Sequence, residues 1–122
     1  MAVDFSDFIC WADDEATRGE SAEFPLRNAS SRAYYALYHA AATRAKALTI
    51  PIIRVEKAGS HEALIQAIRT YSPKGKSLAD DMERTKKFRH RCDYDLDTDV
   101  RPEKALKQIS EVKRLIDLLS RL

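Results

Sequence analysis

The sequence predicts an all-α fold, an up-and-down helical bundle of four main helices plus one short helix. Three observations favour it. Apolar residues recur in steps of three and four along most of the chain. Only three glycines and four prolines interrupt 122 residues, of which 33% are charged. The one branched apolar run, Ile50 to Val55, has no partner strand. A chain of this length forms a single domain, residues 1–122.

The first predicted helix runs from Asp4 to Arg18 and is amphipathic. Its apolar side carries Phe5, Phe8, Ile9, Ala12 and Ala16, with Trp11 at the edge. Gly19 ends this helix, and a short polar link leads to Glu23. Links of this length join antiparallel neighbours, so the next helix should pack alongside the first.

The second predicted helix, from Pro25 to Leu48, is the longest segment with one periodicity, and we expect it at the centre of the bundle. Its apolar stripe consists of Leu26, Ala29, Ala33, Leu37, Ala40, Ala41, Ala45 and Leu48. Side chains as small as alanine let neighbouring helices approach closely. A second face carries Arg32, Tyr35 and His39, which are either solvated side chains or the lining of a functional groove.

A loop of about ten residues should follow Leu48, because Pro51 disfavours helix at the residue before it. We expect its apolar residues to cover the core: Ile50, Ile52, Ile53 and Val55. Ser60 is predicted to cap the short third helix. The inward residues of that helix are Leu64, Ala67, Ile68 and Tyr71, and the turn Ser72 to Gly75 ends it.

The fourth predicted helix, from Ser77 to Asp95, has a basic face beside its apolar stripe. The stripe contains Leu78, Met82, Thr85, Phe88 and Cys92. Arg84, Lys87 and Arg91 follow one another at helical spacing and form the predicted phosphate-binding surface.

The last predicted helix, Pro102 to Leu122, carries the stripe Leu106, Ile109, Val112, Ile116 and Leu119. Leu115, Leu118 and Leu122 widen this apolar arc. The arc lies either in the middle of the bundle or against another subunit.

Charge is unevenly distributed, although the net formal charge is only +2. Seven acidic residues and one basic residue lie between Asp4 and Glu23, whereas the segment from Arg84 to Arg91 has five basic residues, one histidine and no acid. These are either two ordinary solvated faces or an acidic patch and a basic patch, of which the basic one meets phosphate or an acidic partner.

The two cysteines, Cys10 and Cys92, are isolated, with no CxxC pair and no histidine at zinc spacing. The sequence therefore indicates no metal, and it contains no nucleotide-cofactor motif. Both cysteines fall on apolar stripes and suit buried thiols in a reducing cytosol. Acidic residues interrupt the N-terminal segment, so we expect no signal peptide or membrane span and a cytoplasmic location.

Two short segments carry a resemblance to a known family. The segment SRAYYALYHAA, Ser31 to Ala41, resembles the second-helix signature of small stand-alone HEPN proteins (higher eukaryotes and prokaryotes nucleotide-binding). The segment RCDYD, Arg91 to Asp95, is similar to a second family motif, and His61 sits where similar proteins often have a histidine. The resemblance implies a helical bundle that forms a homodimer and binds RNA or nucleotide in a toxin–antitoxin or defence system.

Many HEPN proteins are metal-independent endoribonucleases in which an arginine is separated from a histidine by four to six intervening residues. Such an arginine can hold the scissile phosphate, and the imidazole can move a 2′-hydroxyl proton. Three pairs have this spacing: Arg32 with His39, Arg54 with His61, and Arg84 with His90.

The family's helix position selects Arg84 and His90 among these pairs. The RCDYD alignment instead selects Arg91, with Tyr94, Asp95 or Asp97 at the place of the histidine.

The resemblance thus implies Arg91, Arg84 and His90 as catalytic residues. It implies a nucleic-acid surface made of Arg32, Tyr35, His39, Lys87 and Tyr94. The alternative is a non-catalytic HEPN module that binds a minimal nucleotidyltransferase or an antitoxin through its acidic and apolar faces. In that case Arg91 and Asp95 form a structural pair, and the tyrosines serve packing.

Overall fold

The computed structural model describes residues 3–18, 22–54 and 59–122 and contains five α-helices. They are α1 (Phe5–Thr17), α2 (Glu23–Ala47), α3 (Ser60–Tyr71), α4 (Pro73–Tyr94) and α5 (Pro102–Ser120). The described residues form no strand, which confirms the all-α prediction. Over these same residues, every helix is too short or too polar to cross a lipid bilayer.

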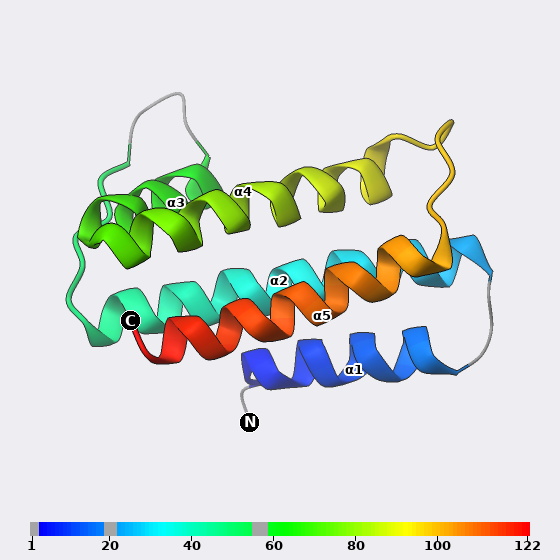
Figure 1. Cartoon of the computed structure of the whole chain (residues 1–122), viewed down its shortest axis with the longest axis horizontal. Coiled ribbons are helices and arrows are strands. Elements are labelled where there is room, and N and C mark those ends of the chain that lie inside the picture. The colour runs from blue at the N-terminus through cyan, green and yellow to red at the C-terminus, as the bar shows by residue number, and fades with distance from the viewer. Residues whose placement is uncertain (1–2, 19–21, 55–58) are drawn as a thin grey trace.

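Helix α2 is the centre of the bundle and contacts each of the other four helices. In Figure 1, α3 and α4 lie on one side of α2 and α5, and α1 lies on the opposite side. Helices α4 and α5 run in opposite directions, as do α1 and α2. The predicted stripe of α2 is buried from Leu26 to Ala45, and only its last residue, Leu48, is partly exposed. The alanines thus allow the close packing that the sequence predicts.

The junction between α3 and α4 differs from the prediction. The residues Ser72 to Gly75 do not form a turn, because Ser72 alone separates the two helices. The Ser72 side chain accepts a hydrogen bond of 3.0 Å from the Gly75 backbone, and Pro73 occupies the first helical position. Serine followed by proline is a favourable helix start, which explains why α4 begins four residues before Ser77.

Two other helix starts also differ. Helix α2 begins at Glu23, two residues before Pro25, so proline occupies its third position. Helix α3 has Gly59 rather than Ser60 as its N-cap, and no side chain caps it. The extended backbone of Gly59 leads the chain into the helix one residue earlier than the prediction.

The loop after α2 covers the core less than expected. The NH groups of Thr49 and Ile50 bond to the Lys46 and Ala45 carbonyls, and Thr49 has a positive φ of 52°. This arrangement is a Schellman motif. It keeps Ile50 against the core, while Ile52 and Ile53 are exposed. The prediction that these two residues are buried is therefore wrong, and Val55 lies outside the described residues.

Three further burial predictions are wrong. Cys10 is exposed, since it lies two positions before Ala12 and thus on the opposite side of α1, whereas Cys92 is buried as expected. Burial raises the pKa of the Cys92 thiol to about 11. Tyr71 is exposed at the C-terminal end of α3, and Leu106 is exposed because the buried stripe of α5 begins at the preceding residue, Ala105, which leaves Leu106 at the border of that stripe.

The broad apolar arc of α5 is largely covered within the chain. Leu115 and Leu119 are fully buried, and Leu118 and Leu122 pack partly buried against the core. The C-terminal end is held further by Arg44, which donates a 2.7 Å hydrogen bond to the Leu122 carbonyl. Of the two alternatives for this arc, the packing within the bundle accounts for most of it.

Arg27 ties the C-terminal end of α4 to α2. Its guanidinium is buried and donates to the carbonyls of Arg91, Cys92, Asp95 and Thr98. Glu23 accepts from Arg27 at 3.1 Å and from the Val100 backbone at 3.1 Å. Carbonyls at the end of a helix lack partners within that helix, so Arg27 acts as a cap supplied by another helix.

Candidate functional site between α2, α3 and α4

Arg84 and His90, the pair that the spacing selects as catalytic, do not lie on the same side of α4. Arg84 lies on the side of α4 that faces α5, where it pairs with Asp81 and, at 3.7 Å, with Glu111. His90 is exposed and its ring contacts Tyr94, with the centroids 4.7 Å apart. His90 lies six positions after Arg84, which places the two residues about 120° apart around the helix.

Arg91, Lys87 and Tyr94 are also exposed on α4. The predicted phosphate surface of Arg84, Lys87 and Arg91 is thus exposed along one side of the helix. Arg84, which has carboxylate partners, lies at the edge of that surface toward α5.

Another arginine of α4, Arg89, lies inside an aromatic cluster. Its guanidinium carbon is 5.3 Å from the ring centroid of Tyr34 and 5.7 Å from that of Tyr35. The side chain is only 12% exposed. Both tyrosines belong to α2, so the contact of α2 with α4 places a cation against two aromatic faces.

His61, in the first turn of α3, completes this cluster. Its ring stacks on Tyr34 with centroids 5.5 Å apart and lies 4.1 Å from the Tyr38 centroid. Its Nδ1 atom shares a 2.8 Å hydrogen bond with the Tyr34 hydroxyl. Burial, followed by the positive charges of Arg89 and Lys86, lowers the His61 pKa. The imidazole is therefore neutral at pH 7 and has a nitrogen free to accept a proton.

The guanidinium of Arg89 is incompletely satisfied. Asp93, one turn later, is 3.5 Å away and also accepts a 3.1 Å hydrogen bond from the Ser31 hydroxyl. The Arg89 Nε is buried, and no residue in the described part of the chain accepts its proton. A buried donor without a partner costs about 1–3 kcal/mol, and such groups are found where a ligand or ion completes the hydrogen bonding.

Lys86, by contrast, has a partner. Its ammonium donates to Glu62 at 3.1 Å, and Gln66 donates to the other oxygen of Glu62 at 2.9 Å. These two hydrogen bonds lower the Glu62 pKa, while burial and the nearby Glu62 raise that of Glu83. Lys86 is thus paired closely with Glu62, whereas Arg89 has only the longer 3.5 Å contact with Asp93 and an Nε without an acceptor among the described residues.

Comparison with known proteins does not assign a function to this chain. No family model, curated protein or solved structure matches this chain. The function therefore has to be inferred from the chemistry of the site.

Three residues of the predicted nucleic-acid surface border the cluster. The guanidinium carbon of Arg32 is 5.4 Å from the Tyr35 centroid. The His39 ring lies between Tyr38 and Phe8, at 5.3 Å from each centroid. The structure thus brings Arg32, Tyr35 and His39 together with His61 and Arg89, away from Arg84 on the opposite side of α4.

Arg89 is not among the residues predicted from the sequence, although the sequence contains a signal for it. Arg89 lies four residues after Thr85 and three before Cys92, so it borders the buried stripe of α4. An arginine in that register faces a neighbouring helix rather than solvent. In residues 3–18, 22–54 and 59–122, no three histidine, cysteine or acidic side chains are grouped as metal ligands.

Proposed function

We propose that this chain is a HEPN-type RNA-binding protein of a toxin–antitoxin or defence system and that it cleaves RNA without a metal. In this proposal Arg89 holds the scissile phosphate and His61 acts as general base. The observation that carries it is the incompletely hydrogen-bonded guanidinium of Arg89 in the same aromatic cluster as the neutral His61. Arginine suits this role because its planar fork matches two phosphate oxygens.

The proposed reaction is an attack by the ribose 2′-hydroxyl on the adjacent phosphorus. His61 takes the hydroxyl proton as the O2′–P bond forms, and the P–O5′ bond breaks. The products are a 2′,3′-cyclic phosphate and a 5′-hydroxyl, whose proton comes from water. Arg89 stabilises the additional negative charge on the phosphate oxygens during this step.

This role requires one tautomer of His61. The hydrogen must lie on Nδ1 and be donated to the Tyr34 oxygen, so that Nε2 presents its lone pair to the substrate. Burial raises the pKa of Tyr34, so the phenol stays protonated and neutral at pH 7. A neutral Tyr34 accepts this hydrogen bond without drawing the proton away from the imidazole. It also fixes the orientation of the ring.

The test is cleavage of a fluorescently labelled RNA in EDTA by the wild-type chain and by Arg89→Gln and His61→Gln. We expect each substitution to lower the cleavage rate by about 100-fold or more, since each removes a group used in the transition state. Arg101→Gln is the matched control, because Arg101 is exposed on a different part of the chain. A deoxyribose at the cleaved position should abolish the reaction.

Parallel variants separate the two possible sites. Loss of cleavage in Arg84→Gln, His90→Gln or Arg91→Gln, with full activity in Arg89→Gln, would show that the active site lies on the solvent-exposed side of α4. Absence of cleavage by the wild-type chain, with RNA binding retained, would leave an RNA-binding protein without the enzyme activity.

A second candidate function is the non-catalytic partner module. The segment from Asp93 to Asp99 favours it, because Tyr94 and Leu96 are 65% and 74% exposed among four acidic residues. An acidic and apolar surface of this kind suits a basic protein partner such as a minimal nucleotidyltransferase or an antitoxin. No cleavage, together with loss of partner binding in Leu96→Ser, would support this candidate.

The proposal includes a homodimer in the cytoplasm. A dimer is the usual assembly of HEPN ribonucleases, and sedimentation of the purified chain tests it. The two free cysteines suit a reducing compartment.

A further inference from the structure

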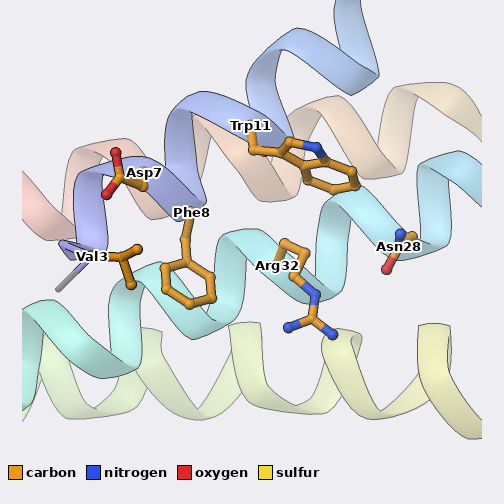
Figure 2. Close-up of a pocket in the computed structure, with 6 residues that line it drawn as sticks. All are labelled: Val3, Asp7, Phe8, Trp11, Asn28 and Arg32. Carbon is orange, nitrogen blue, oxygen red and sulfur yellow. The ribbon is translucent and has the colours of Figure 1, made fainter. Parts of the chain in front are cut away.

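A pocket lies between α1 and α2, on the side of the bundle next to the aromatic cluster. Its volume is about 410 Å³, and Figure 2 shows Phe8 and Trp11 of α1 facing Asn28 and Arg32 of α2 across it. We infer that this pocket is a subsite for a purine base of the RNA strand whose phosphate lies at Arg89. The inference rests on the proposed function and adds base selectivity to it.

The apolar part of the pocket suits a flat ring. Trp11 is 45% exposed and Val3 75% exposed, although both are large apolar residues on a helix or at its start. Stacking on an aromatic side chain is the usual way in which a protein holds an unpaired base of single-stranded RNA. The Asp7 carboxylate at the same pocket repels phosphate, which favours a neutral base there.

The polar part of the pocket supplies base-edge contacts. Asn28 and Arg32 are one turn apart on α2, and both are exposed. Their side chains form no hydrogen bond or ion pair with any of the residues that the structure describes. An asparagine amide can pair with N6 and N7 of adenine, and an arginine with O6 and N7 of guanine. Pyrimidines have no N7 atom and therefore cannot form either of these paired contacts, so the pocket should prefer purines.

A continuous series of ring contacts joins the pocket to the proposed catalytic cluster. Phe8 contacts His39, His39 contacts Tyr38, and Tyr38 contacts His61, with centroid distances of 5.3, 5.3 and 4.1 Å. On the other side, Arg32 and Arg89 both contact Tyr35. An RNA strand that crosses this surface can therefore place one base in the pocket and a neighbouring phosphate at Arg89.

Trp11 is the only tryptophan of the chain, so its fluorescence reports on the pocket directly. The experiment titrates the wild-type chain with AMP, GMP, UMP and ribose 5-phosphate, with N-acetyl-tryptophanamide as the control for optical effects. We expect AMP or GMP to quench the emission saturably, UMP to bind about tenfold more weakly, and ribose 5-phosphate to have no effect. Equal responses to AMP and ribose 5-phosphate, or no saturable response, would overturn the inference.

Two variants test whether the nucleotide binds in this pocket, and both retain Trp11 as the fluorescent reporter. Asn28→Ala should weaken the binding of AMP about tenfold, and Arg32→Gln should weaken the binding of GMP about tenfold. Arg18→Gln, a matched exposed arginine at the other end of α1, should bind like the wild type. Unchanged binding by both pocket variants would exclude this pocket as the subsite.

The outcomes separate this inference from the proposed function. RNA cleavage that needs Arg89, without purine quenching of Trp11, removes the subsite and keeps the ribonuclease. Quenching without cleavage keeps the purine pocket and removes the ribonuclease. The last measurement compares the affinities of the chain for oligoadenylate and oligouridylate of equal length. Tighter binding of oligoadenylate would show that the pocket accepts a base of an RNA strand and not only a free nucleotide.

Discussion

At the scale of single residues, Arg27 has the largest structural role that can be traced to one side chain. It donates to four carbonyls at the end of α4 and in the following loop, and it is only 6% exposed. Two of these carbonyls belong to Arg91 and Cys92, directly before Asp93, the carboxylate beside Arg89. The buried Arg27 therefore supports both the fold and the candidate site.

Replacement of Arg27 by alanine should lower the free energy of unfolding by about 3 kcal/mol. The variant leaves several carbonyls unsatisfied and Glu23 without its cation. Urea denaturation followed by circular dichroism measures the change. Arg101→Ala, an exposed arginine, should alter stability by less than about 0.5 kcal/mol. Equal stabilities of the two variants would show that the Arg27 hydrogen bonds are not needed for the fold.

His61 should make stability depend on pH. Its pKa in the folded chain is lowered from 6.5, mainly by burial and then by Arg89, Lys86 and His39. Between the lowered value and 6.5 the unfolded chain binds more protons than the folded chain. The free energy of unfolding should therefore fall as pH decreases through this interval.

The measurement is urea denaturation of the wild type and of His61→Gln at pH values between about 5 and 8. The variant should lose less stability toward low pH than the wild type. Parallel pH profiles for the two proteins would show that His61 has the same proton affinity in both states.

The sequence could predict the types of residue in the site better than their positions. Tyr35, Arg32 and His39 were expected on one face of α2, and the structure places them around the cluster. On α4 the counting rule selected Arg84 with His90, which lie on different sides of the helix. The helical period places Arg89 beside the buried stripe, but only the packing of α4 against α2 shows that its neighbours are the tyrosines.

At the scale of helices, the close approach of α3 and α4 depends on Gly75. A Cβ atom built at this position would lie 2.2 Å from the backbone oxygen of Ile68. The connection through Ser72 alone leaves the two helices no freedom to move apart locally. Glycine is therefore needed inside α4 despite its low helix propensity.

Gly75→Ala should destabilise the chain by about 2 kcal/mol, although alanine is the better helix former. Gly59→Ala is the matched control, because a Cβ there meets no atom within 4 Å and φ is −70°. Thermal denaturation of both variants measures the difference. A Gly75→Ala protein as stable as Gly59→Ala would mean that the two helices can separate without cost.

Helix identity follows from periodicity, whereas helix ends depend on local contacts that periodicity does not encode. The stripes of α2 and α4 were predicted almost residue by residue, since burial of one face requires that spacing. The start of α4 was placed four residues late, because Ser72 and Pro73 fit a turn as well as a cap. The exposure of Ile53 likewise follows from the positive φ of Thr49, which the sequence does not reveal.

At the scale of the whole molecule, the proposed RNA path combines cations from two helices. Arg32 comes from α2, and Lys86 and Arg89 come from the side of α4 that faces α2 and α3. Four acidic residues of α1 lie on the far side of α2 and α5 from α4 (Figure 1), but the acidic segment from Asp93 to Asp99 directly follows the α4 residues of the cluster. The electrostatic part of the proposed binding therefore depends on the phosphate contact of Arg89 itself.

RNA affinity should therefore fall with added salt, with a slope of about −0.7 for each phosphate contacted on a single strand. Arg89→Gln should reduce the magnitude of that slope by about 0.7, whereas Arg32→Gln, which removes a base contact rather than a phosphate contact, should leave the slope nearly unchanged. Fluorescence anisotropy of a labelled RNA at several salt concentrations measures both slopes. Arg101→Gln should keep the wild-type slope, and a salt-independent affinity would contradict a phosphate contact at this surface.

The position of Trp11 determines what intrinsic fluorescence reports during unfolding. Among the described helices, α1 contacts α2 and α5 but neither α3 nor α4. Emission from this indole therefore follows the docking of the first helix, while far-ultraviolet ellipticity follows all five. If detachment of that helix precedes global melting, the two signals will give different midpoints, and the gap between them will measure how independently the N-terminal segment undocks.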